Sequence, residues 1–254
     1  MNITLERAGA VGVLRIDGEG ETPVLSRPLL EAKSRLLAEA DADPGLRCLV
    51  ITGSGRIYLA GADLGGLEEP SEALAFNREL IDVAAQVENL STPTIFAFNG
   101  HCFGAGLEIS LAGSIRVAAA GAKIGLPETT VGLLPGTASM ERLFRTVPRG
   151  GGLKMVLTGD PLPAEEAFRL GVIDQVVDGA DFDAEVLTLA TRIAGNAPLA
   201  TRAVVEVERS RRHSTPEEVI DMAHERLEVL FASGDFKEGL AAFREKREPD
   251  FQGS

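Results

Sequence analysis

The sequence predicts an α/β protein whose first half alternates strands with helices and whose last part is helical. Short apolar runs rich in β-branched residues are separated by longer amphipathic segments as far as Gly136. Beyond Gly136 the pattern becomes almost wholly helical. The alternation predicts βαβ-type units with mixed or parallel strand pairing, and with catalytic loops at the strand ends.

Strands are predicted where apolar runs are short and end at turn residues. They are Ile3 to Arg7, Val11 to Ile16, Cys48 to Gly53, Thr94 to Phe98, Ile115 to Ala119 and a short one near Ile124. Helical periodicity predicts helices from Ser26, acting as a side-chain N-cap, to Ala40, from Ser71 to Asn89, and from Leu107 to Ala112. The glycine-rich segment Gly53 to Leu67 is predicted to be mobile without ligand.

The helical part is divided by prolines at helix starts and glycines at helix ends. Helices are expected from Pro148 toward Leu157, Pro163 to Gly171, Phe182 to Gly195, Pro198 to Arg212, Pro216 to Ala232 and Phe236 to Arg247, with an extended piece at Val172 to Val177.

Composition excludes several classes of protein. The 254 residues are 44% hydrophobic and carry a formal net charge of −13, which argues against general binding to nucleic acids or anionic membranes. Cys48 and Cys102 form no disulfide framework, and the N-terminus is not signal-like, so a reducing cytoplasm is expected. The three histidines are scattered without ligand-like partners, so no metal is expected.

Two glutamates lie in apolar, glycine-rich surroundings between Phe98 and Gly136. Glu108 follows the turn Gly104-Ala105-Gly106, where the N–H groups at a helix start could stabilise an oxyanion. Glu128 follows Leu126-Pro127. Taken singly, the glycine-rich segment could be only a tight turn, and a glutamate in the first turn of a helix could serve only to complement the helix dipole. Together, two carboxylates in apolar settings indicate raised or split pKa values, as acid–base chemistry needs.

These residues resemble the enoyl-CoA hydratase (crotonase) family. The resemblance rests on Asn99-Gly100, on Gly104 to Glu108, on Pro127-Glu128 with Gly132, Pro135 and Gly136, and on Leu59-Ala60-Gly61-Ala62-Asp63-Leu64. It extends from about Val11 to the segment Glu238 to Arg247.

The resemblance implies a crotonase-like spiral of ββα units, residues 1–195, which carries the active site. Residues 196–254 would be a helical region that forms a homotrimer or a dimer of trimers. The reaction implied is the reversible addition of water to a trans-2-enoyl-CoA thioester, with coenzyme A as part of the substrate and no separate cofactor.

Site residues follow from the same resemblance. Glu108 and Glu128 would be catalytic, the backbone N–H groups of Ala62 and Ala105 would form the oxyanion hole, and Gly136 would position the water. Contacts to substrate or CoA would come from Ala60, Gly61, Asp63, Leu64, Gly104, Phe243 and Lys246.

The chain departs from the family pattern at four places. Gly113-Ser114 replaces the usual Cys-Asp, so a structural carboxylate is missing and a looser helix end is expected. Ala138-Ser139 replaces two glycines near the acyl end, which predicts an unusual acyl specificity. The segment Asp17 to Ser26 is acidic, and Gly65-Gly66 stands where a Lys or Arg is common, so CoA phosphates would meet Lys246, Arg247 or Arg27.

Three functions stay open. Hydration is favoured because both glutamates are present. Another crotonase-type reaction, such as isomerisation, decarboxylation or thioester hydrolysis, would use the same oxyanion hole, and a carrier-protein thioester is an alternative substrate. A non-catalytic scaffold is the third, and it would have no use for buried carboxylates beside glycine-rich turns.

Overall fold

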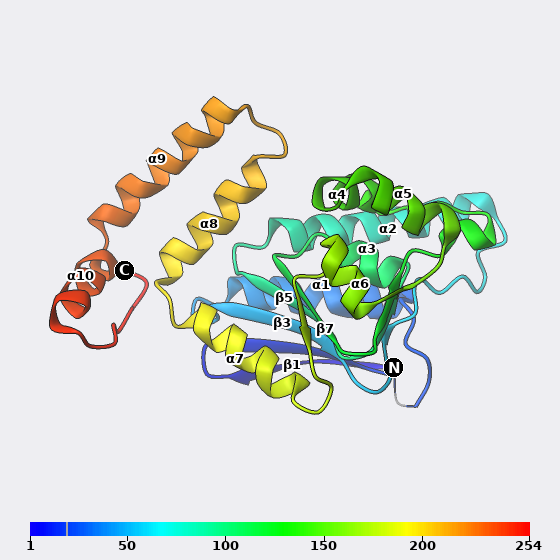
Figure 1. Cartoon of the computed structure of the whole chain (residues 1–254), viewed down its shortest axis with the longest axis horizontal. Coiled ribbons are helices and arrows are strands. Elements are labelled where there is room, and N and C mark those ends of the chain that lie inside the picture. The colour runs from blue at the N-terminus through cyan, green and yellow to red at the C-terminus, as the bar shows by residue number, and fades with distance from the viewer. Residues whose placement is uncertain (19) are drawn as a thin grey trace.

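The computed structural model describes residues 1–18 and 20–254, and its body is built on two sheets (Figure 1). The larger sheet has six strands in the order β1-β2-β3-β5-β7-β10, parallel except for the antiparallel pair β1 and β2. These strands are β1 (Asn2–Ala8), β2 (Val11–Asp17), β3 (Cys48–Gly53), β5 (Thr94–Phe98), β7 (Ile115–Ala119) and β10 (Gln175–Val177). The predicted mixed α/β architecture is confirmed.

The smaller sheet has the order β4-β6-β8-β9. Its strands are β4 (Ile57–Leu59), β6 (His101–Phe103), β8 (Lys123–Gly125) and β9 (Leu162–Pro163). Each of β4, β6 and β8 directly follows a strand of the larger sheet, so the chain steps from one sheet to the other three times, as the ββα spiral requires. The sequence did not predict β4, β6 or β9, because two or three residues are too few to show a period.

Ten α-helices and one 3₁₀ helix are found in the described residues. They are α1 (Arg27–Ala42), α2 (Pro70–Asn89), α3 (Ala105–Ser110), η1 (Glu128–Val131), α4 (Ser139–Thr146), α5 (Arg149–Thr158), α6 (Ala164–Leu170), α7 (Phe182–Ala194), α8 (Pro198–Ser210), α9 (Pro216–Ala232) and α10 (Gly234–Glu245).

Two predicted bounds of these elements are wrong, and one cap is borne out only in its position. Ser26 is the N-cap residue of α1, as predicted, but its side chain makes no capping hydrogen bond. The helix α3 begins at Ala105, not at Leu107, because glycine at position 106 is tolerated inside its first turn. The extended piece after α6 is a strand only from Gln175 to Val177.

Both faces of the larger sheet are covered. In β3, Leu49 and Ile51 point into a core shared with α1, α2, α3 and the smaller sheet, whereas Cys48 and Val50 point into a second core under α7. A strand buried on both faces has no polar side, which explains the continuous apolar run in its sequence. Cys48 and Cys102 are buried free thiols.

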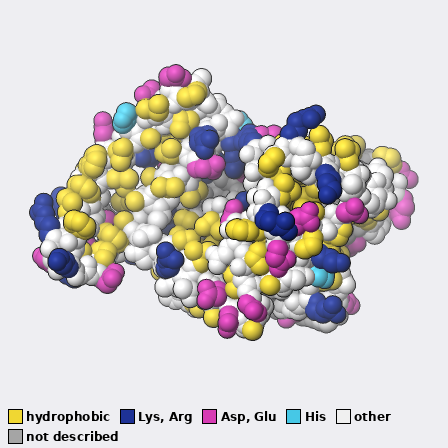
Figure 2. All heavy atoms as spheres, in the orientation of Figure 1, with side chains coloured by type: hydrophobic (Ala, Val, Ile, Leu, Met, Phe, Trp, Pro, Cys, Tyr) yellow, Lys and Arg dark blue, Asp and Glu magenta, His cyan; other side chains and the backbone are white. Residues whose placement is uncertain are grey.

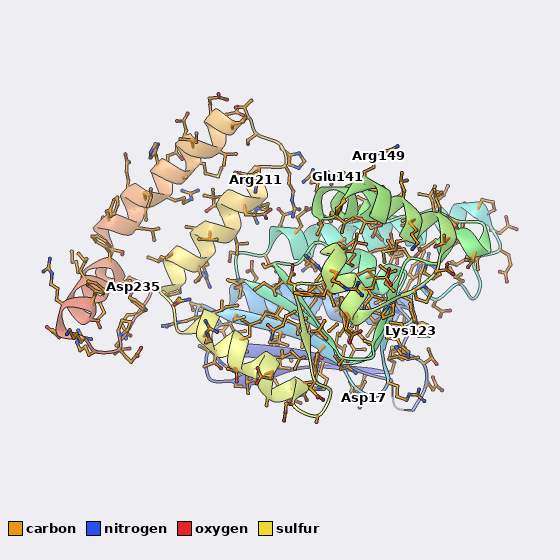
Figure 3. All side chains as sticks on the ribbon, in the orientation of Figure 1. Asp17, Lys123, Glu141, Arg149, Arg211 and Asp235 are labelled. Atoms are coloured by element: carbon orange, nitrogen blue, oxygen red, sulfur yellow. The ribbon has the colours of Figure 1, made fainter. Side chains whose placement is uncertain are left out.

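Helices α8, α9 and α10 form an arm that extends away from the body (Figure 1). Within it, Arg226 on α9 pairs with Glu206 on α8. The C-terminal residues fold back onto α10, where the buried Asp235 accepts hydrogen bonds from the N–H groups of Gln252 and Gly253 (Figure 3). The division at residues 195 and 196 stays a prediction. Among the described residues, no helix has the length and apolar character needed to cross a membrane.

Candidate active site

Two turns meet at one edge of the smaller sheet. Strands β4 and β6 pair in parallel, with Leu59 opposite Cys102, so the turns that follow them leave the sheet on the same side. Gly106, in the first turn of α3, packs directly on Leu59: an added Cβ would lie 2.6 Å from the Leu59 Cβ. Glycine at this position therefore lets the N-terminus of α3 approach the end of β4.

The two turns present unpaired backbone donors. Gly61 and Gly104 adopt φ values of 122° and 52°, and a Cβ on Gly104 would lie 3.4 Å from the Gly61 Cα, so the backbones adjoin. The backbone of Leu25 holds the first turn: its N–H donates to the Gly61 carbonyl at 2.8 Å, and its carbonyl accepts from the Asp63 N–H at 2.9 Å. Within the described residues, the N–H groups of Ala62 and Ala105 donate no hydrogen bond. Small side chains leave both donors accessible.

Glu108 lies in α3 and is 4% exposed. Its Oε2 accepts three hydrogen bonds: from the Thr137 N–H at 2.9 Å, the Thr137 Oγ1 at 3.1 Å and the Ser139 Oγ at 2.6 Å. Ser139 was expected near the acyl chain, and its contact with Glu108 was not predicted from the sequence. Only the hydroxyl group of Ser139, which stands in place of a glycine, hinted at it.

Glu128 is the first residue of η1. Burial, and secondly the negative charge of Glu108, raise the pKa of Glu128 to about 7. Its Oε2 is buried without a hydrogen-bond partner in the described part of the chain. Its Oε1 lies beside the turn after β6, since a Cβ on Gly104 would approach it to 2.8 Å. The carboxyl group therefore adjoins the turn that carries the Ala105 donor.

Gly136 lies next to Thr137 and so next to the Glu108 carboxylate. Its carbonyl accepts a long hydrogen bond of 3.4 Å from the Asn77 Nδ2, while its N–H donates to no described residue. The structure thus gathers two carboxyl groups and three unpaired N–H groups around the turns that follow β4 and β6. This arrangement suits a reaction that develops charge on a carbonyl oxygen while protons move nearby.

Comparison with known proteins agrees with this geometry. Residues 6–254 match the profile of the enoyl-CoA hydratase/isomerase family. The chain belongs to that family. A crystal structure of enoyl-CoA hydratase from Bacillus anthracis superposes with a TM-score of 0.95 at 30% identity, covering 100% of both chains.

Curated relatives extend over nearly the whole chain. A crotonyl-CoA hydratase from Syntrophomonas wolfei subsp. wolfei (strain DSM 2245B / Goettingen) is 34% identical, covering 98% of this chain and 97% of its own. A 2,3-dehydroadipyl-CoA hydratase from Escherichia coli (strain K12) is 32% identical, with coverages of 99% and 98%. The names of these two relatives concern different acyl groups.

The other residues that the family resemblance implies for substrate or CoA binding fall into two groups, one in the loop after β4 and one at the end of the arm. The Ala60 N–H donates to the Pro23 carbonyl, and Asp63 Oδ1 accepts from the Gly65 N–H at 3.0 Å, so both shape the loop after β4. Leu64 is 54% exposed on that loop. Phe243, 84% exposed, lies on α10, and Lys246 directly follows that helix at the end of the arm, so neither is brought to the glutamates within one chain (Figure 1).

The two arginines suggested for CoA phosphates already have carboxylate partners. Arg27 pairs with Glu72 and Glu79, and Arg247 pairs with Glu238 and Glu245. Either pair would have to rearrange to meet a phosphate. In the acidic segment that precedes α1, Glu19 lies outside the described residues.

Ser114, at one departure from the family pattern, is tied to the sheet. Its N–H donates to the Thr94 Oγ1 at 2.9 Å, and the neighbouring Arg116 is held by Asp174. Asp174 thus supplies a carboxylate at this place from a distant part of the chain.

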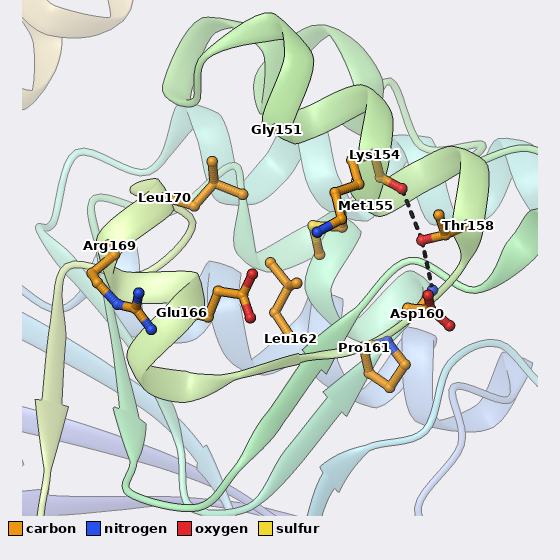
Figure 4. A pocket seen from close by; sticks show the side chains of 10 residues that line it. All are labelled: Gly151, Lys154, Met155, Thr158, Asp160, Pro161, Leu162, Glu166, Arg169 and Leu170. Atoms are coloured by element: carbon orange, nitrogen blue, oxygen red, sulfur yellow. Dashed lines mark hydrogen bonds between the residues drawn. The ribbon is translucent and has the colours of Figure 1, made fainter.

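A pocket of about 390 Å³ lies between α5 and α6, lined in part by Met155, Leu162 and Leu170 (Figure 4). None of the implied site residues lines it. Among the described residues, no group of three or more His, Cys, Asp or Glu side chains could hold a metal ion.

Proposed function

We propose that this protein is an enoyl-CoA hydratase that adds water reversibly to a trans-2-enoyl-CoA thioester. The observation that carries the proposal is the placement of Glu128, whose pKa is raised to about 7, against the turn bearing the unpaired Ala105 N–H and within electrostatic reach of Glu108. The names of the relatives support the same reaction.

The thioester carbonyl would lie between the N–H groups of Ala62 and Ala105. When the oxygen of the water bonds to Cβ, the electrons of the double bond move toward Cα and the carbonyl oxygen. The thioester becomes an enolate whose negative charge lies largely on that oxygen. Two backbone donors stabilise that charge because they are fixed before the reaction, and each such donor contributes roughly 3–4 kcal/mol in oxyanion holes generally.

The two glutamates would divide the proton transfers. Glu108 takes the proton from the water held by the Gly136 N–H, and the resulting hydroxide oxygen bonds to Cβ. Glu128, which is half protonated near pH 7, gives its proton to Cα as the enolate collapses. A proton then returns from Glu108 to Glu128 through water, which restores the starting state.

The CoA end of the substrate would be bound by a neighbouring subunit in a homotrimer or hexamer. Phe243 and Lys246 are presented at the end of the arm, away from the glutamates of their own chain. Apolar side chains are exposed along the arm (Figure 2), among them Val204, Ile220, Val229, Phe231 and Phe236. Such a surface suits subunit contacts. We also place the protein in the cytoplasm, where its two free thiols would stay reduced.

Glutamine substitutions test the mechanism. With crotonyl-CoA and longer or branched enoyl-CoAs, Glu108→Gln and Glu128→Gln should each lower kcat by about 10²–10⁴ with little change in binding. The double variant should be scarcely worse than the poorer single one, since residues that act as a unit are non-additive. Glu39→Gln, on the exposed face of α1, is the matched control.

Three outcomes would redirect the proposal. Near-wild-type hydration by Glu108→Gln would refute the mechanism. If the wild type consumed no conjugated enoyl-CoA, or if one glutamate dominated and the other were nearly silent, another crotonase-type reaction such as double-bond isomerisation would replace hydration.

A further inference from the structure

We infer that Thr137 and Ser139 are positioning residues that direct one oxygen of Glu108 toward the reacting water. The inference rests on the proposed hydration, and it assigns a role to the two hydroxyl residues that flank Ala138. The three residues Thr137 to Ser139 are called the hydroxyl turn below.

All hydrogen bonds that Glu108 accepts from described residues end on Oε2. The Ser139 Oγ, the Thr137 Oγ1 and the Thr137 N–H approach it at 2.6, 3.1 and 2.9 Å. The other oxygen, Oε1, accepts none from the described residues, and it is not among the fully buried atoms that lack a partner. Oε1 is therefore the oxygen left open to a ligand or water, and rotation of the carboxylate would break bonds to the hydroxyl turn.

The hydroxyl turn has a backbone that aims both hydroxyl groups at one atom. Ala138 adopts the left-handed conformation, with φ of 58°, which is uncommon for a residue with a Cβ. With Ala138 in this conformation, the Thr137 and Ser139 side chains on either side of it both donate to the Glu108 Oε2. Both side chains are fully buried.

The turn is fixed from outside the site. One helical turn after Ser139, the Arg142 Nη1 donates to the Thr137 carbonyl at 2.7 Å. The Arg142 Nη2 also pairs with Glu88 on α2 at 2.9 Å. The hydroxyl groups thus have a support that does not depend on Glu108, which is what a positioning residue requires.

A pair of matched substitutions separates the hydroxyl from its volume. Thr137→Val removes the Oγ1 and keeps the shape and the N–H, whereas Thr137→Ser keeps the hydroxyl. Ser139→Ala removes the shortest bond. Thr188→Val on α7, whose hydroxyl donates to the Ala184 carbonyl of its own helix, is the control for a threonine far from the site.

With crotonyl-CoA, Ser139→Ala should lower kcat about 10-fold to 100-fold, the range expected for a lost hydrogen bond to a charged group, while KM stays within about twofold. Thr137→Val should lower kcat by about 3-fold to 10-fold, and Thr137→Ser should restore most of that loss. In the Glu108→Gln background, Ser139→Ala should cost less than about threefold, because the oriented base is already gone.

Kinetic and structural results could each overturn the inference. Equal losses from Ser139→Ala in the wild-type and Glu108→Gln backgrounds would mean that the hydroxyl does not act through Glu108. The same conclusion would follow if Thr137→Val and Thr137→Ser were equally active, and this pair decides the matter should Ser139→Ala fail to fold.

Crystal structures of the wild type and of a folded hydroxyl variant keep the test separate from the proposed function. If the wild type hydrates no enoyl-CoA, the function fails, but the inference about Glu108 is still decided by whether its carboxylate rotates when the hydroxyl is removed. An unmoved carboxylate would overturn it.

Discussion

Removing the charge of Glu108 should shift the pH dependence that Glu128 imposes on hydration. In the proposed mechanism Glu128 must carry a proton in the free enzyme, so kcat/KM should fall as the pH rises through about 7, its pKa in the fold. Burial is the larger cause of the raised pKa, and the Glu108 charge is the second. Glu108→Gln removes the second cause, so the pKa of Glu128 should drop.

The size of this shift is bounded by the structure. The pKa of Glu128 rises from 4.5 to about 7, and the charge of Glu108 accounts for the smaller share of that rise because burial contributes more. We expect the alkaline limb of Glu108→Gln to lie lower by about one pH unit. The direction follows from the sign of the interaction: a nearby anion favours the protonated form of Glu128, and its removal favours the ionised form.

The assay is the loss of the conjugated thioester absorbance across the pH range, followed for the wild type, Glu108→Gln and the control Glu39→Gln. The wild-type dehydration reaction should show the same limb as hydration, because both directions use the glutamate pair when it carries one proton. A limb that stays in place or moves to higher pH in Glu108→Gln would refute the electrostatic coupling. A wild-type profile without any limb near neutral pH would refute the role of Glu128.

Three further predictions concern the turn, the core and the arm. Gly104→Ala should lower kcat at least about 10-fold and destabilise the fold by about 1–2 kcal/mol, because its Cβ would lie 2.8 Å from the Glu128 Oε1 at a positive φ. Gly9→Ala, also at positive φ but with nothing within 4 Å, should lose stability and keep activity in the same urea and kinetic measurements. Lys33→Met should stabilise the protein by about 3 kcal/mol at pH 7, because burial lowers the Lys33 pKa from 10.5 to about 8 and its Nζ has no hydrogen-bond partner among the described residues. Lys33 binds its proton more tightly in the unfolded chain than in the fold, so the stability gained by Lys33→Met should be full below pH 8 and vanish as the pH rises to 10.5. A stability gain that persisted at pH 10.5 in denaturant titrations would contradict the burial of a charged Lys33 as its cause. Deleting residues 234–254 should weaken CoA binding more than it disturbs the body, and a truncated protein with normal affinity in calorimetry would contradict a role for the arm.

The sequence by itself determined the class of fold and most of its elements. The continuous apolar run of β3 and the periodicity of α2 are properties of neighbouring residues, so they can be found without tertiary information. Glu108 and Glu128 could be selected in the same way, because carboxylates among apolar residues and glycines are uncommon. The family resemblance supplied the rest of the expected site, including Ala62 and Ala105.

Tertiary structure decided which groups meet. The hydrogen bonds from Thr137 and Ser139 to Glu108 join residues 29 and 31 positions apart, and no local period or spacing predicts such a contact. The same holds for Asp174, which reaches Arg116 across 58 residues. The raised pKa of Glu128 also required the fold, because it comes from burial and from a charge on another element. Local patterns reflect only the chain's nearest neighbours, whereas desolvation and long-range contacts exist only after the two sheets and α3 have packed.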